Sequence, residues 1–191
     1  PAARRLADDA KRAASKLSLS TVRSMGLTAA GGAERCRIEV GDMVVAVATF
    51  VDPATGEPRV ACGSRGGVKI YDPVAGGAAL VVINAGSLVR ALAVFKDPAT
   101  GEPRLACGIR DGKVRIFDSV AGGEALLVIE MGSDVFALVV FADPATGAPR
   151  LACASGKKVL ILNLVAGGEA LVVIDVDSEV KALAVFADPA T

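Results

Sequence analysis

Apolar runs of strand length alternate with short turn segments along most of the chain. Between residues 88 and 130 four such runs follow one another, at 88–95, 104–108, 113–117 and 125–129. The run at 113–117 alternates polar with apolar residues, which is the period of a half-buried strand. Gly and Pro residues separate the runs, and no part of this stretch has the 3.6-residue apolar period of a helix. The pattern therefore predicts four consecutive β-strands.

The four-strand stretch is one copy of an internal repeat. The segment Asp-Pro-Ala-Thr starts at Asp52, Asp97, Asp143 and Asp188, so that successive copies are 45, 46 and 45 residues apart. Four antiparallel strands in a repeat of about 45 residues are typical of one blade of a β-propeller. We therefore predict an all-β fold, a β-propeller. A parallel β-helix is the structural alternative, but its coils are usually shorter and contain fewer hairpin turns.

Three complete blades and parts of two others fit this spacing. The predicted complete four-stranded antiparallel blades are about 44–84, 88–130 and 134–175. Glu34–Val40 is expected to form a fourth strand without its first three, and Glu179–Phe186, within the partial copy 179–191, a first strand without its successors. Because known propellers close a ring of about 4–8 blades, we expect the sequence to be a segment of a longer polypeptide. The unpaired strands at both ends should favour self-association through open sheet edges.

Residues 105–118 resemble the core of a WD40 repeat. They read Leu-Ala-Cys-Gly-Ile-Arg-Asp-Gly-Lys-Val-Arg-Ile-Phe-Asp, where the family pattern is Leu-Ala-Ser-Gly-Ser-x-Asp-Gly-Thr-Val-Arg-Leu-Trp-Asp. The dipeptides at the Trp-Asp position are Tyr71-Asp72, Phe117-Asp118 and the most diverged copy, Leu162-Asn163. Those at the Gly-His position are Gly86-Ser87 and Gly132-Ser133. The resemblance covers residues 31–191 and implies a WD40-like propeller, in which the strands of a blade are lettered A to D from the centre outward.

The chain departs from this family in having no His and no Trp. The buried hydrogen-bond tetrad of many WD40 blades uses both residue types, so it cannot form here. Since 52% of the residues are hydrophobic, we expect apolar packing to hold the blades. Cys62, Cys107 and Cys153 occupy one position of the repeat, too far apart to form disulfides, and Cys36 is the fourth cysteine. Reduced thiols indicate an intracellular, cytoplasmic location.

The first 27 residues are expected to form a separate region ahead of the propeller fragment at 28–191. Apolar residues at helical spacing predict a short amphipathic α-helix over 2–17, followed by a linker. This helix either packs on the propeller or belongs to a preceding domain. Because residues 1–25 contain six Lys or Arg and only two Asp, docking on a partner or a membrane surface is the alternative. Membrane insertion is not expected, since no apolar run reaches 18 residues.

Chemical motifs are mostly absent, and no catalytic, cofactor-binding or metal-binding residue is predicted. Without His the commonest general base is missing, and the cysteines are too widely spaced for a zinc cluster. Residues 63–67 are interpreted as a hairpin turn rather than an anion cradle, and the acidic residues between 175 and 179 as a solvated loop rather than a cation site. The net charge of zero, the few aromatic residues and the lack of a basic stripe argue against nucleic-acid binding.

The repeat copies differ from one another mainly on one side of the predicted propeller. The A–B loops (Asp-Pro-Ala-Thr-Gly) and the C–D turns (Val-Ala-Gly-Gly) are nearly identical, whereas the D–A and B–C loops of the other side vary. Selection for a binding surface would concentrate changes in this way, and drift on unconstrained loops is the alternative. The candidate partner-binding residues are Arg65, Arg90, Arg110, Asp111, Met131, Phe136, Lys157 and Lys181.

The function expected from these features is that of a non-catalytic scaffold or adaptor. It would bind a protein or peptide partner through the D–A and B–C loops, where Arg, Met and Phe are residue types enriched in interfaces. One alternative is a propeller region of a larger enzyme or regulatory protein whose catalytic groups lie elsewhere. Another is a structural subunit of a large assembly.

Overall fold

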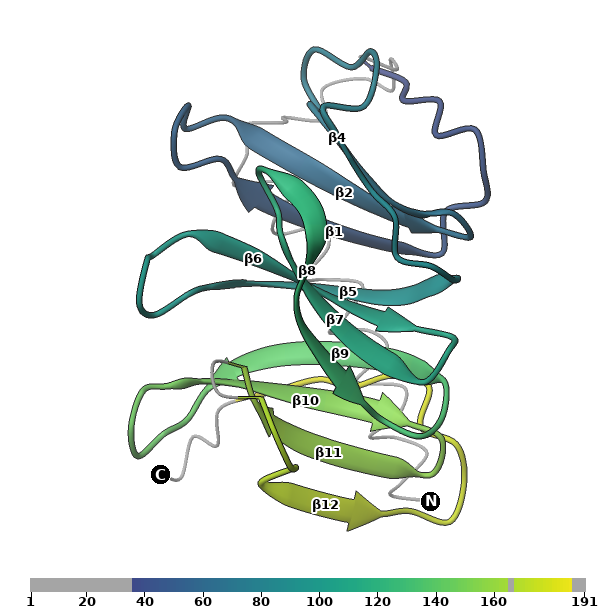
Figure 1. Ribbon diagram of the computed structural model, residues 1–191, viewed down its shortest axis with the longest axis vertical. Coiled ribbons are helices and arrows are strands. Elements are labelled where there is room, and N and C mark those ends of the chain that lie inside the picture. The colour runs from purple at the N-terminus through teal and green to yellow at the C-terminus, as the bar shows by residue number, and fades with distance from the viewer. Residues whose placement is uncertain (1–35, 165–166, 187–191) are drawn as a thin grey trace. The chain divides into compact units, whose positions relative to one another are not determined.

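The computed structural model describes residues 36–164 and 167–186, and within these ranges the fold is all-β (Figure 1). The described residues form strands and turns and contain no helix. The helix predicted over 2–17, with the rest of the region 1–27, lies outside the described residues. Residues 36–183 form one compact unit, and it is this unit that carries the strands.

Three four-stranded antiparallel sheets follow one another along the chain. The first contains β1 (Ala46–Val51), β2 (Pro58–Ser64), β3 (Gly67–Tyr71) and β4 (Val81–Ile83). The second contains β5 (Val89–Lys96), β6 (Pro103–Ile109), β7 (Lys113–Asp118) and β8 (Gly122–Glu130). The third contains β9 (Val135–Ala142), β10 (Pro149–Ser155), β11 (Lys158–Asn163) and β12 (Val172–Asp175). In each sheet the strands pair in chain order, which confirms the three predicted four-strand units.

The loop between the first two strands of each sheet is a compact turn that its own sequence dictates. The backbone carbonyl of Asp52 accepts a hydrogen bond from the N–H of Gly56 at 2.8 Å, and its carboxylate accepts one from the N–H of Ala54 at 3.0 Å. Gly56 has a φ of +73°, a conformation that costs glycine little and other residues much more. Gly101 and Gly147 repeat this arrangement, which explains why the segment Asp-Pro-Ala-Thr-Gly recurs.

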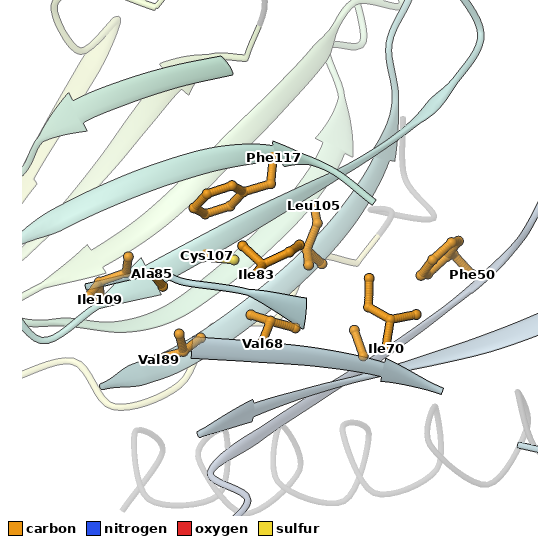
Figure 2. Packing of buried hydrophobic residues seen from close by; sticks show 11 residues of the cluster. Phe50, Val68, Ile70, Ile83, Ala85, Val89, Leu105, Cys107, Ile109 and Phe117 are labelled. Atoms are coloured by element: carbon orange, nitrogen blue, oxygen red, sulfur yellow. The ribbon is translucent and has the colours of Figure 1, made fainter. Parts of the chain in front are cut away.

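Apolar side chains of neighbouring sheets interdigitate to form the core. Between the first and second sheets, Val68, Ile70 and Ile83 pack with Leu105 and Phe117 (Figure 2). A cluster of equivalent residues joins the second and third sheets. Its members include Phe95, Val114, Ile116, Ile129, Leu151, Cys153 and Leu162. Burying a side chain of this size contributes about 2 kcal/mol, so these two clusters are the main source of stability.

The cysteines lie where the repeat predicts them. Cys62, Cys107 and Cys153 are buried at equivalent places in β2, β6 and β10, which confirms that part of the prediction. All four cysteines are free in the structure.

Two predicted partial strands are not strands in the structure. Within the described parts 36–40 and 179–186 no residue belongs to a strand, so the expectations for Glu34–Val40 and Glu179–Phe186 are corrected here. The reason is that a strand is defined by hydrogen bonds to a neighbouring strand, and the described residues supply none beside either segment. Segment 36–40 nevertheless packs on the first sheet, because Val40 lies in a buried cluster with Cys62 and Tyr71.

Candidate interaction surface

The antiparallel order of each sheet sends its loops alternately to two ends of the strands. One end, called the uniform end, carries the A–B loops 52–57, 97–102 and 143–148 together with the C–D turns. The other, called the variable end, carries the B–C turns and the connections from each sheet to the next. The eight candidate partner-binding residues belong to the variable end or to the strand residues beside it.

At the uniform end of each sheet an Arg of the second strand pairs with the Asp of the A–B loop, and in the first two sheets it also pairs with an Asp at or just after the end of the third strand. Arg104 of β6 reaches Asp97 of the A–B loop at 3.4 Å and Asp118 at the end of β7 at 2.6 Å. In the first sheet Arg59 makes the equivalent contacts with Asp52 and Asp72, at 3.2 and 3.7 Å. In the third, Arg150 pairs with Asp143 at 2.9 Å. The invariant loop residues are therefore occupied in holding their own loops.

The carboxyl groups of these pairs all have pKa values below the usual value for Asp, so the pairs favour the anionic form. The pKa of Asp97 is lowered mainly by the backbone N–H of Ala99, with a further contribution from Arg104. At Asp118 partial burial is the largest single influence and raises the pKa, but the N–H groups of Ala121 and Val120 together with Arg104 outweigh it, so the net pKa is lowered. Sequence reasoning found these residues as a repeat and missed their pairing, although Asp and Arg seven residues apart in every copy were the available signal.

At the variable end, four of the candidate residues are exposed on B–C turns. These are Arg65, Arg110, Asp111 and Lys157. Asp111 pairs with Arg115 of β7 at 2.7 Å, and the backbone N–H of Arg65 donates to the Asp42 carboxylate at 3.1 Å. Arg65 lies in the hairpin turn of the first sheet and Lys157 in that of the third, with the second sheet between them. The two cations are therefore separate charged sites and do not line one pocket.

Three other candidates, Arg90, Phe136 and Lys181, meet in one group. The guanidinium carbon of Arg90 is 5.0 Å from the centroid of the Phe136 ring, and the Lys181 ammonium is 3.5 Å from it. Arg90 also pairs with Asp134 at 3.0 Å, and Lys181 with Glu179 at 2.6 Å. We call these five residues the Phe136 cluster. Cation–π contacts of this kind are worth about 0.5–2 kcal/mol each.

The Phe136 cluster is electrically balanced. Its two cations face two carboxylates, and the pKa of Glu179 is lowered by the hydrogen bond from Lys181 and by the positive charges of Lys181, Arg90 and Lys157. The Nε atom of Arg90 is buried without a hydrogen-bond partner. Sequence reasoning had aligned Arg90, Phe136 and Lys181 as one position of successive repeats. It could not show that they touch, and it missed Asp134.

Met131 lies half-buried and has a packing role. Its side chain contacts the apolar cluster between the second and third sheets, and its backbone N–H donates to the carbonyl of Gly112 at 2.7 Å. This bond ties the connection between two sheets to the B–C turn of the second.

Groups that would support other functions are sparse in the part of the chain that the structure describes. No cluster of three or more His, Cys, Asp or Glu side chains gathers there as a metal site would. Burial raises the pKa of the Cys153 thiol to about 12 and that of Cys107 further still, so neither is a ready nucleophile. Residues 36–164 and 167–186 include no helix that is long and apolar enough to cross a membrane.

Comparison with known proteins supports the fold. No protein-family model and no curated protein matches the sequence. The crystal structure of the computationally designed Ika8 protein superimposes with a TM-score of 0.60 and 24% identity, over 81% of this chain and 44% of that one. A chain in the structure of the Chaetomium thermophilum Polycomb Repressive Complex 2 bound to GSK126 superimposes with a TM-score of 0.52 and 18% sequence identity. The match covers 68% of this chain and 30% of that one. The crystal structure of BBS1N in complex with ARL6DN superimposes with a TM-score of 0.54 and 17% sequence identity. The match covers 71% of this chain and 44% of that one.

The last two of these structures contain proteins of the propeller type. The present chain spans less than half the length of each of the three chains that it matches. At such identities the likeness concerns the fold alone.

Proposed function

We propose that this chain is a WD40-like β-propeller region that acts as a protein-interaction scaffold, with its variable end as the binding surface. The observation that carries this proposal is the contrast between the two ends. The uniform end repeats the Arg–Asp pair of the A–B loop in every sheet, of which Arg104 with Asp97 is one case. The variable end presents a different set of exposed charges on each hairpin, which is what recognition of an asymmetric partner requires.

The propeller architecture is supported by the repeat and by the sheets. Three sheets of four antiparallel strands at a period of 45–46 residues match one blade per repeat. The superpositions on propeller-type proteins have TM-scores above 0.5, which favours this arrangement over a parallel β-helix.

A protein or peptide is the partner class that the chemistry supports. The exposed tips mix cations such as Arg65 and Lys157 with the anion Asp111, and nucleic acid would select a continuous basic surface instead. The chain contains no His for acid–base chemistry, and we propose a non-catalytic role on that basis. Four free cysteines support an intracellular, cytoplasmic location, because free thiols persist in reducing compartments.

The experiment compares charge-reversal variants of the two ends. The triple variant Arg65→Glu, Arg110→Glu, Lys157→Glu changes the variable end, and the double variant Glu57→Lys, Glu102→Lys changes exposed residues of the uniform end. Each protein, immobilised, is incubated with lysate, and bound proteins are compared by quantitative mass spectrometry. We expect a defined set of proteins to be retained by wild type and by the uniform-end variant but lost from the triple variant. Equal binding to all three proteins would contradict the proposal.

A further inference from the structure

Two clefts at the uniform end are built from equivalent residues of successive repeats. The first cleft lies between the first and second sheets and has a volume of about 240 Å³, and the second cleft lies between the second and third sheets and has a volume of about 130 Å³. Both walls of each cleft belong to described sheets, so each is a complete feature of a junction between neighbouring repeats. The equivalent lining residues include Phe50 and Phe95, Ile70 and Ile116, and Arg59 and Arg104.

The first cleft has an apolar floor and an apolar mouth. Phe50 and Ile70, which belong to the core shown in Figure 2, are buried lining residues and form its floor. Leu80 and Val120 also line it, and they are 54% and 38% exposed. Exposed apolar groups beside a hollow contribute binding free energy when an apolar group of a partner covers them. The cleft is therefore suited to an apolar side chain.

The volumes set the size of the group that each cleft accepts. An apolar cavity of about 150 Å³ holds one benzene molecule, so the second cleft, with about 130 Å³, matches a single Leu or Ile side chain. The first cleft is larger, because it has Val81 and Ser119 where the second has Leu127 and Leu164. It has room for Phe or Met.

The rim of each cleft carries a net negative charge. At the first cleft the guanidinium of Arg59 pairs with two carboxylates, those of Asp52 and Asp72, at 3.2 and 3.7 Å. One positive and two negative charges leave a net charge of −1. Arg104 has the same two-carboxylate arrangement beside the second cleft, and the exposed Glu57 adds a further negative charge to the loop of the first. Such a rim attracts cations and repels anions.

We propose that the two clefts are docking sites for basic peptide segments of a partner protein. One aliphatic or aromatic side chain of the peptide would enter the cleft, and a flanking Lys or Arg would lie at the carboxylates of the rim. An acidic peptide would instead bring like charges together at Asp52 and Asp72. The clefts lie at the end opposite to the variable end, and the inference is independent of the function proposed for that surface.

The probes are capped peptides of the pattern Lys-Lys-X-Lys-Lys, in which X is Leu, Ile, Met or Phe. They are titrated to millimolar concentration into the isotope-labelled whole chain, and amide chemical shifts report the two clefts separately, through Phe50 and Arg59 at the first and Phe95 and Arg104 at the second. We expect saturable shifts at both clefts, with the Phe peptide favouring the larger first cleft. Peptides with Ala at X, or with Glu in place of Lys, should bind more weakly by a factor of about ten or more.

The double variant Leu80→Gln, Val120→Gln removes apolar contacts at the mouth of the first cleft without changing the charge. Peptide binding there should weaken by a factor of about ten. Binding at the second cleft of the same molecule should stay within a factor of about two of wild type, which also shows that the variant is folded.

The matched control is the double variant Val82→Gln, Val74→Gln. Val82 lies close to Leu80 in the chain, and Val74 stands at the repeat position of Val120. They are 65% and 67% exposed and line neither of the two clefts. Binding to this control should stay within a factor of about two of wild type at both clefts.

Three outcomes would overturn the proposal. One is the absence of saturable shifts with all four peptides, and another is a set of shifts confined to the variable end. The third is equal affinity for the Leu and Ala peptides, for the Lys and Glu peptides, or for the two double variants. Binding that does not weaken as the salt concentration rises would likewise contradict the role of the rim carboxylates, since salt screens exposed charges.

Discussion

Arg104 and Asp118, fourteen residues apart in the chain, form a 2.6 Å ion pair that joins the start of β6 to the end of β7. The same guanidinium also holds Asp97 in the loop before β6. The side chain of Arg104 is largely shielded from solvent, so its loss would leave two carboxylates without their partner. The ion pairs of Arg104 therefore hold the A–B loop against the sheet and are not merely contacts on the protein surface.

Replacing Arg104 with Ala should lower the free energy of unfolding by about 1–3 kcal/mol, because hydrogen bonds to partly buried charges contribute in this range. Urea denaturation followed by circular dichroism measures the change. Arg110→Ala, at an exposed turn, is the control and should alter the value by less than about 0.5 kcal/mol. Equal effects of the two variants would show that the pairing at the uniform end is not stabilising.

The stability of the protein should fall in acid. The pKa values of Asp52, Asp97 and Asp143 are lowered in the folded state, each chiefly by a backbone N–H in its own loop. A lowered folded-state pKa contributes stability above the unfolded value of about 3.9, and this contribution is lost as pH falls through the folded value. We expect a plateau in the free energy of unfolding near neutral pH and a decline below about pH 4.

The urea midpoint measured at a series of pH values tests this expectation. In the variant Asp97→Asn the free energy of unfolding should fall less steeply with decreasing pH than in wild type, since one of the titrating groups is removed. A decline that begins near pH 6 would contradict the assignment to these aspartates.

The close approach of neighbouring sheets leaves little room for a side chain at Gly108. A Cβ atom added there would lie 2.6 Å from Cγ1 of Val135, so Gly108→Ala should destabilise the protein by about 1–3 kcal/mol through overpacking. Gly66→Ala is the matched control, because no atom lies within 4 Å of its added Cβ and its φ is not positive. Thermal unfolding of the two variants gives the comparison, and equal midpoints would contradict the packing described at this junction.

Thiol reactivity reports on the buried cysteines. Burial raises the pKa of Cys107 and Cys153, so the reactive thiolate is scarce at pH 8 as well as inaccessible. We expect four free thiols in the denatured protein without reductant. In the native protein, Cys107 and Cys153 should react only on unfolding, whereas the partly exposed Cys36 reacts directly. Two or fewer thiols after denaturation would mean that disulfides form.

The sequence alone was sufficient to predict the sheets, because their signals are local. The predicted unit 88–130 agrees with the observed span from Val89 to Glu130. The alternation of polar and apolar residues and the Gly-containing turns are both properties of neighbouring residues in the sequence. Glu179–Phe186 carries the same alternation but forms no strand in the structure. Its local pattern is suitable, and what it lacks is a neighbouring strand to supply hydrogen bonds, which no local pattern can show.

The candidate surface was predictable only in part for the same reason. Comparing repeat copies identified Arg90, Phe136 and Lys181 as one aligned position. The contacts between them depend on how consecutive sheets are placed, as does the pairing of Arg90 with Asp134 across 44 residues. Alignment of repeats indicates which residues are equivalent, and the fold decides which of them touch.

The two kinds of ion pair have opposite consequences for how such a chain can grow. Arg104, Asp97 and Asp118 all belong to one sheet, so a duplicated repeat brings with it everything needed to close its own loop. Tandem duplication can therefore add units without compensating mutations elsewhere. Arg90 and Asp134 belong to successive repeats, and a pair of this kind makes the order of the units matter. Once such pairs have formed, exchanging or deleting a repeat breaks them. The repeats are then no longer interchangeable, and their order along the chain is fixed.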